Sequence, residues 1–131
     1  MAVNDFETEV FDAVYSVLTD LIPEGNFRSE ETPIFESFPA ATLIRMDSFP
    51  DWRRESTSNS EDFTVDTYEA HVYALDRDEC KTIANTIAER MREMNFQRLT
   101  MRPVLNGNDV RVSQIVMRFE GRVDGRGYLY R

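Results

Sequence analysis

The stretch Phe63-Thr-Val-Asp-Thr-Tyr-Glu-Ala-His-Val-Tyr-Ala-Leu75, together with Asp76 to Met94 behind it, sets the predicted architecture. From Tyr68 to Ala74, every second residue is apolar or small, which is the period-two pattern of a strand with one buried face. Asp76 and Glu79 then have the spacing of a capping box, and apolar side chains recur at helical intervals after them. Only a capping residue separates the two elements, so the helix is expected to fold back over the sheet.

A second helix is predicted over Asp5–Leu21 because Asn4 and Glu7 repeat the capping-box spacing. Pro23 and Gly25 are expected to end it. Its predicted buried stripe consists of Phe6, Val10, Val14, Val17 and Leu21, with Ala13 and Leu18 alongside.

Three further strands are predicted, over Ala40–Met46, Phe96–Arg102 and Val110–Val123. The apolar residues of the last of these do not keep one phase, which predicts a bulge near Ser113. Gly121 is expected to interrupt its end. The segments 26–36 and 128–131 could each add a short strand at an edge of the sheet.

The order of elements is helix, strand, strand, helix, strand, strand. It predicts an α+β fold, with two helices packed on one face of a mainly antiparallel sheet of about four to five strands. At 131 residues the chain has the length of a single domain, covering residues 1–131.

Residues 47–62 have no usable apolar period and are rich in residues that favour turns. This connection is longer than is usual within a domain, and it predicts a functional arm or a hairpin with a mobile tip. Trp52 lies on it beside Arg53 and Arg54, a combination enriched at protein interfaces. The alternative is that Trp52 folds back to cap the core.

Charge is distributed unevenly along the chain. Residues 1–65 carry 14 acidic and 4 basic side chains, a net of −10, whereas residues 66–131 carry 10 acidic and 11 basic ones, a net of +1. An acidic protein with this balance is unsuited to wrapping nucleic acid, so no sequence-specific nucleic-acid binding is expected. The asymmetry is either an ordinary solvated surface or a set of complementary faces between subunits.

The sequence shows no pattern typical of an active site. A nucleophile usually needs a nearby base, and His71 and Cys80 are the only histidine and cysteine, one on the predicted strand and the other on the helix stripe. One histidine and one cysteine are too few for a Cys/His zinc site, and no phosphate loop or dinucleotide fingerprint is present. We therefore expect no enzyme, metal or cofactor, and no apolar run predicts a membrane span.

Two sets of segments resemble the tail terminator, or tail-completion, proteins of long-tailed phages. The first runs from Val65 to Leu75, continues through Cys80–Met91 and ends with Met94–Arg98. The second comprises Asn106-Gly-Asn-Asp-Val110, then 118–124 and 128–131. The resemblance covers roughly residues 38–131 and consists of strand, helix and turn patterns rather than signature residues.

The resemblance implies a virion protein at the head-proximal end of the tail, assembled in the host cytoplasm into a ring, commonly a hexamer. Such a ring stops polymerisation of the tail tube and forms the docking surface for the head or neck. Its partners would be other copies of itself, the tube protein and a head-completion protein. The residues expected at subunit or tube contacts are Trp52, Arg53, Arg54, Arg118, Arg122 and Arg126.

Two alternatives remain open from sequence. In the same class, the chain could be a head–tail connector, or neck, protein or another minor tail protein. In a different class, it could be a small ligand-binding or regulatory α+β domain, which would be a monomer or dimer stabilised by its ligand.

Overall fold

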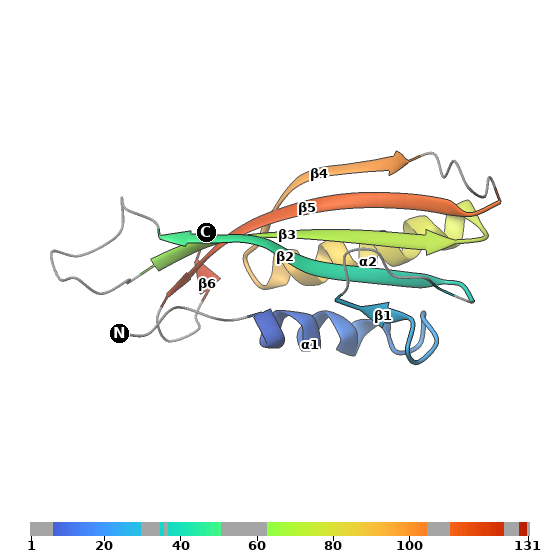
Figure 1. The fold of residues 1–131 in the computed structure, drawn as a ribbon, viewed down its shortest axis with the longest axis horizontal. Coiled ribbons are helices and arrows are strands. Elements are labelled where there is room, and N and C mark those ends of the chain that lie inside the picture. Colours follow the sequence, from blue (N-terminus) through green and yellow to red (C-terminus); the bar gives the residue numbers. More distant parts are fainter. Residues whose placement is uncertain are drawn as a thin grey trace, which may run out of the picture.

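The computed structural model describes residues 7–29, 35, 37–50, 63–104, 111–124 and 129–130. The elements are, in order, α1 (Glu7–Leu18), β1 (Phe27–Arg28), β2 (Ala40–Pro50), β3 (Phe63–Ala74), α2 (Arg77–Glu93), β4 (Gln97–Val104), β5 (Ser113–Asp124) and β6 (Leu129–Tyr130). Four long strands and two two-residue strands form one sheet, and both helices pack on one of its faces (Figure 1). The predicted two-layer α+β fold is confirmed.

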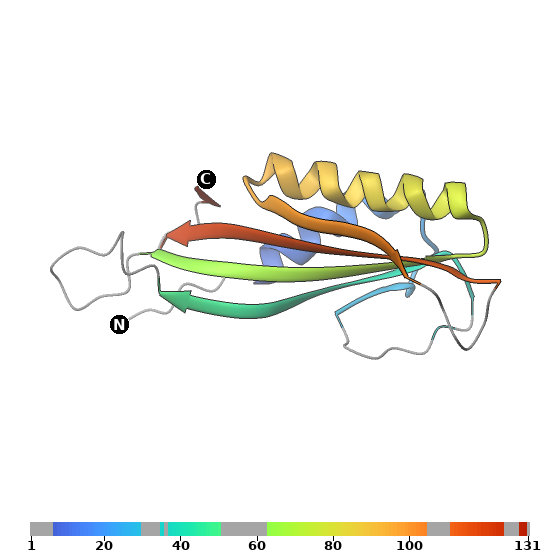
Figure 2. The same cartoon turned by 90° about the horizontal axis from the view of Figure 1, so that it is seen from above.

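The strand order of the sheet is β1-β2-β3-β5-β4, and β6 pairs with the end of β5 (Figure 2). All neighbouring pairs are antiparallel except β1 and β2, which are parallel. Because β5 is antiparallel to both β3 and β4, those two strands run in the same direction with β5 between them. The unit β3–α2–β4 is therefore a split βαβ motif.

Helix α2 begins where the sequence predicts. The side chain of Asp76 accepts a hydrogen bond from the backbone N–H of Asp78 at 3.0 Å, and the backbone N–H of Cys80 donates to the Asp76 carbonyl at 3.0 Å. The Asp76 side chain thus binds the second amide of the helix. The capping-box spacing had instead predicted a bond to the amide of Glu79. At the other end, Asn95 takes a left-handed backbone conformation with φ 67°, which turns the chain towards β4.

Helix α1 buries Val10, Val14 and Leu18, which lie four residues apart. The predicted stripe was wrong at Val17, which is 36% exposed on the side of α1 that faces α2. Residues four apart lie close to one line along a helix, so Leu18 continues the line of Val10 and Val14 towards the sheet, whereas Val17 does not.

The strands differ from their predicted bounds at two places. Strand β2 runs to Pro50, so residues 47–50 of the predicted loop are strand, while 51–62 lie outside the described residues. Strand β5 begins at Ser113, and its register with β3 is continuous from there, so the predicted bulge is wrong. The phase change in the sequence arises because Val112 is buried ahead of the strand rather than within it.

Register shifts occur instead between Arg45 and Asp47 in β2 and between Arg98 and Thr100 in β4. Gly121, which was expected to interrupt β5, lies inside it, paired with Asp66 of β3. A Cβ atom on Gly121 would lie 2.5 Å from Cδ1 of Phe96. The aromatic ring therefore fills the space beside the glycine.

Candidate interaction surfaces

The face of the sheet opposite the helices carries a row of polar side chains, which we call the open face. Alternation along β3 and β5 separates it from the core, since Ala70, Val72 and Met117 point towards the helices and are fully buried. Three facing pairs lie at its centre: Glu69 with Arg118, His71 with Val116, and Tyr73 with Gln114.

A continuous chain of hydrogen bonds crosses this open face. The Nε of Arg118 donates to Oε2 of Glu69 at 2.9 Å, and Oε1 of Glu69 lies 2.7 Å from Nε2 of His71. The side-chain amide of Gln114 lies 3.0 Å from Nδ1 of His71. An NH₂ group only donates, so Nδ1 accepts, and Nε2 carries the hydrogen that is donated to Glu69. This series of hydrogen bonds fixes both the tautomer and the position of the His71 imidazole.

Two effects act in opposite directions on the pKa of Glu69. Burial of its side chain raises the pKa, whereas the hydrogen bonds and electrostatic interactions with His71 and Arg118 lower it, and the net pKa lies below the ordinary value of 4.5. Glu69 is therefore ionised at neutral pH and holds Arg118 against the sheet.

The structure places two of the six predicted contact residues. Arg118 and Arg122 lie four positions apart on β5 and share the open face, Arg118 exposed and Arg122 half-buried. Trp52, Arg53, Arg54 and Arg126 lie outside the described residues.

The outer edge of the sheet, formed by β4, carries exposed side chains that the sequence analysis did not select: Arg98, Leu99 and Arg102. The register shift between Arg98 and Thr100 leaves Leu99 without a Cα partner on β5, and its side chain is 47% exposed. We call these three residues the β4 edge.

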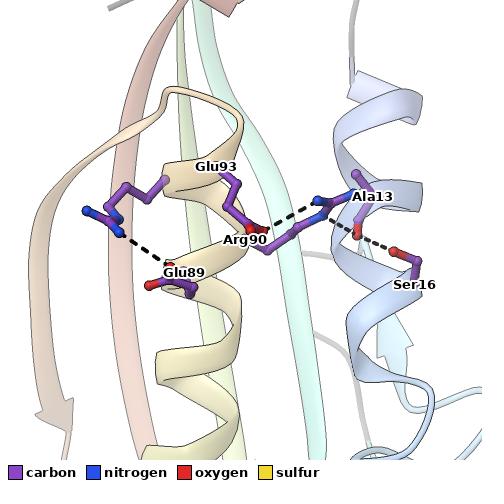
Figure 3. Close-up of polar contacts among 6 residues, drawn as sticks. Ala13, Ser16, Glu89, Arg90 and Glu93 are labelled. Atoms are coloured by element: carbon purple, nitrogen blue, oxygen red, sulfur yellow. Dashed lines mark hydrogen bonds and ion pairs between the residues drawn. The ribbon is translucent and has the colours of Figure 1, made fainter.

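A groove runs between the two helices on the side away from the sheet. Arg90 of α2 reaches across to α1, where its Nε donates to the carbonyl oxygen of Ala13 at 3.1 Å (Figure 3). The hydroxyl of Ser16 donates to the same carbonyl at 2.7 Å, and Nη1 of Arg90 lies 3.4 Å from Glu93. These contacts join the helices at one end of the groove, whose lining residues are Val17, Thr82, Asn85, Thr86, Glu89, Arg90 and Glu93.

His71 and Cys80 do not form a catalytic pair. Cys80 is buried on the helix side of the sheet, where its thiol lies 3.5 Å from the carbonyl oxygen of Val72, while His71 belongs to the open face. Burial raises the pKa of the Cys80 thiol to about 11, which suppresses the thiolate that a nucleophile requires.

Within the described part of the chain, no three His, Cys, Asp or Glu side chains are grouped so that they could hold a metal ion. Neither described helix is both long and apolar enough to cross a membrane.

Comparison with known proteins gives a structural likeness only. No family model and no curated protein sequence matches the chain. Among solved structures, the chain is similar to one from the virion of a native gene transfer agent particle, with a TM-score of 0.65 and 13% sequence identity. The match covers 94% of this chain and 100% of the other, so the two share a fold over nearly all of this chain and all of the other.

Proposed function

We propose that this chain is a structural subunit of a phage-like particle and acts as its tail terminator. The observation that carries the proposal is the end-to-end fold likeness to a chain of a gene transfer agent virion. The likeness includes all of the other chain, so it is not confined to a fragment or a single motif. The resemblance of residues 38–131 to tail terminators supports the finer assignment independently.

In this role, copies of the chain form a ring at the head-proximal end of the tail tube. The ring stops addition of tube subunits and presents a surface to the head or neck. Arg118 and Arg122 of the open face, together with Trp52, Arg53, Arg54 and Arg126, are the proposed subunit or tube contacts. The function is assembly rather than catalysis, and it requires no cofactor.

The test is tube capping. Purified tail tube protein from the same particle is polymerised with and without this chain, and the tube lengths and ends are examined by negative-stain electron microscopy. Light scattering of the chain alone gives its mass over a range of concentration and salt. We expect shorter tubes with a ring at one end.

Unchanged tube lengths and bare tube ends would refute the terminator role. Binding to the isolated neck but not to tubes would instead identify a connector. A stable dimer whose melting temperature rises with small molecules would point to a ligand-binding domain.

A further inference from the structure

We infer that the β4 edge of one copy of this chain seats in the groove between α1 and α2 of the next copy. The inference rests on the proposed ring and adds the subunit contact that would build it. Rings require heterologous contacts, in which two different patches of one subunit meet on its neighbours. The β4 edge and the groove are two such patches.

The β4 edge favours contact through its side chains over backbone pairing with a strand of another copy. An exposed edge strand can pair with the backbone of another chain, and proline and bulges are devices that prevent this. Pro103 removes one backbone N–H from β4, and the register shift at Leu99 disturbs its regular pairing. The same shift exposes Leu99, an apolar side chain that follows Arg98 directly and precedes Arg102 by three residues.

The groove offers complementary chemistry. Val17 of α1 supplies an exposed apolar surface, and Glu89 and Glu93 of α2 supply carboxylates along the other wall. Each of these carboxylates has an arginine partner on its own helix at 3.4 Å, and such long, exposed pairs contribute little. They remain available to arginines of a partner.

Charge along the elements agrees with this pairing. Helix α1 carries Glu7, Glu9 and Asp12 and no basic residue, whereas β4 carries Arg98 and Arg102 and no acidic one. Helix α2 carries equal numbers of acidic and basic residues, so the net negative charge of the helix layer comes from α1. An arginine-bearing edge is attracted to this layer, while edge-to-edge contact of two β4 strands is repelled.

The two patches lie on different sides of the molecule, the groove on the outer side of the helix layer and the β4 edge at one edge of the sheet. Helix α1 packs beside β1, where the ring of Phe11 stacks on that of Phe27 at 4.5 Å, and β1 forms one edge of the sheet. Strand β4 forms the opposite edge (Figure 1). One copy can therefore offer its β4 edge to one neighbour and its groove to another at the same time.

The test uses two charge-reversed variants, alone and mixed. R98E/R102E makes the β4 edge acidic, and E89K/E93K makes the groove basic. Each variant alone brings like charges together, so we expect at least about a tenfold rise in the concentration for half-assembly, measured by light scattering. In an equimolar mixture, each altered patch meets its new complement, and we expect rings of alternating variants at wild-type concentration.

R77E/K81E is the matched control, since it also reverses two exposed basic charges, here at the start of α2, and it should assemble as the wild type does. Far-UV circular dichroism of all variants checks that they fold. If the wild type forms rings and both reversals leave them unchanged, or if the mixture fails to restore assembly, the contact inferred here is wrong while the ring stands. If the wild type forms no ring in solution or on tubes, the ring and this contact fail together.

Discussion

Replacing Gly121 with alanine should destabilise the domain, because the new methyl group would collide with Phe96. Its Cβ would lie 2.5 Å from Cδ1, 2.7 Å from Cε1 and 3.0 Å from Cγ of that ring. Carbon atoms in contact normally lie about 3.5–4.0 Å apart, so the ring would have to move by about 1 Å. Phe96 is only 3% exposed, and its ring meets that of Tyr68 edge-on with centroids 5.3 Å apart. It therefore has little room to move.

Two opposing terms set the expected magnitude. Overpacking a core by a methyl group costs about 1–3 kcal/mol. Replacing glycine with alanine at a compatible backbone position stabilises by about 0.4–1 kcal/mol through the unfolded chain. We expect a net loss of about 1–2 kcal/mol for Gly121→Ala, and a melting temperature lower by about 3–10 °C for a domain of this size.

Urea unfolding followed by far-UV circular dichroism measures the loss, and an unchanged slope would show that the denatured state is unaffected. Phe96→Leu in both backgrounds completes a double-mutant cycle. Leucine removes part of the ring that the methyl group strikes, so Gly121→Ala should cost at least about 1 kcal/mol less in the Phe96→Leu background than in the wild-type background. A Gly121→Ala variant as stable as the wild type, or a cycle without coupling, would refute the steric explanation.

Three other predictions follow from single contacts. The Cys80 thiol, with its pKa raised from 9.0 to about 11, should react with a thiol reagent at pH 8 at least about 100-fold more slowly in the native protein than in urea; equal rates would contradict its burial. Asp76→Ala should lower the free energy of unfolding by about 1 kcal/mol and Asp76→Asn by less, because asparagine still caps α2; identical losses in urea titrations would rule out the cap. Since the pKa of Glu69 is lowered on folding, its contribution is complete above the unfolded value of 4.5 and is lost as pH falls through the lower folded value. Glu69→Gln should therefore make the free energy of unfolding fall less steeply as the pH is lowered through the acidic range. An unchanged fall would show that Glu69 does not contribute to it.

The part of the fold that depends on local signals was predictable from sequence. Alternation in β3, the Asp76 cap and the apolar stripe of α2 all act within a few residues, and each is present in the structure. The bulges were not predictable, because a register shift is a relation between two strands. Val112 shows the same limit, since a buried residue just ahead of a strand has the same sequence pattern as one inside it.

The surfaces that we propose as contacts could be read from the sequence only in part. Arginine-bearing segments were recognised in the sequence, and Arg118 and Arg122 do share one face of β5. Arg98 and Arg102, which we propose as contacts, were not selected from the sequence because only the strand order β3-β5-β4 makes β4 an edge, and no local pattern specifies that order. Likewise, Arg90 contacts a carbonyl 77 residues away, so its role in joining the helices depends on tertiary packing.

The position of β5 between β3 and β4 has a consequence for how the domain opens. Strand β5 pairs with β3, and in the sequence α2 and β4 lie between these two strands. Forming the sheet therefore requires contacts between residues far apart in the sequence, which are slow to form. Backbone amides of β5 that bond to β3 or β4 should exchange with deuterium only when β5 leaves the sheet or the whole domain unfolds. If β5 leaves, a slot one strand wide opens between two parallel neighbours. The same strand of a second copy fits that slot with every native pair restored, so partial unfolding at high concentration favours strand exchange between copies.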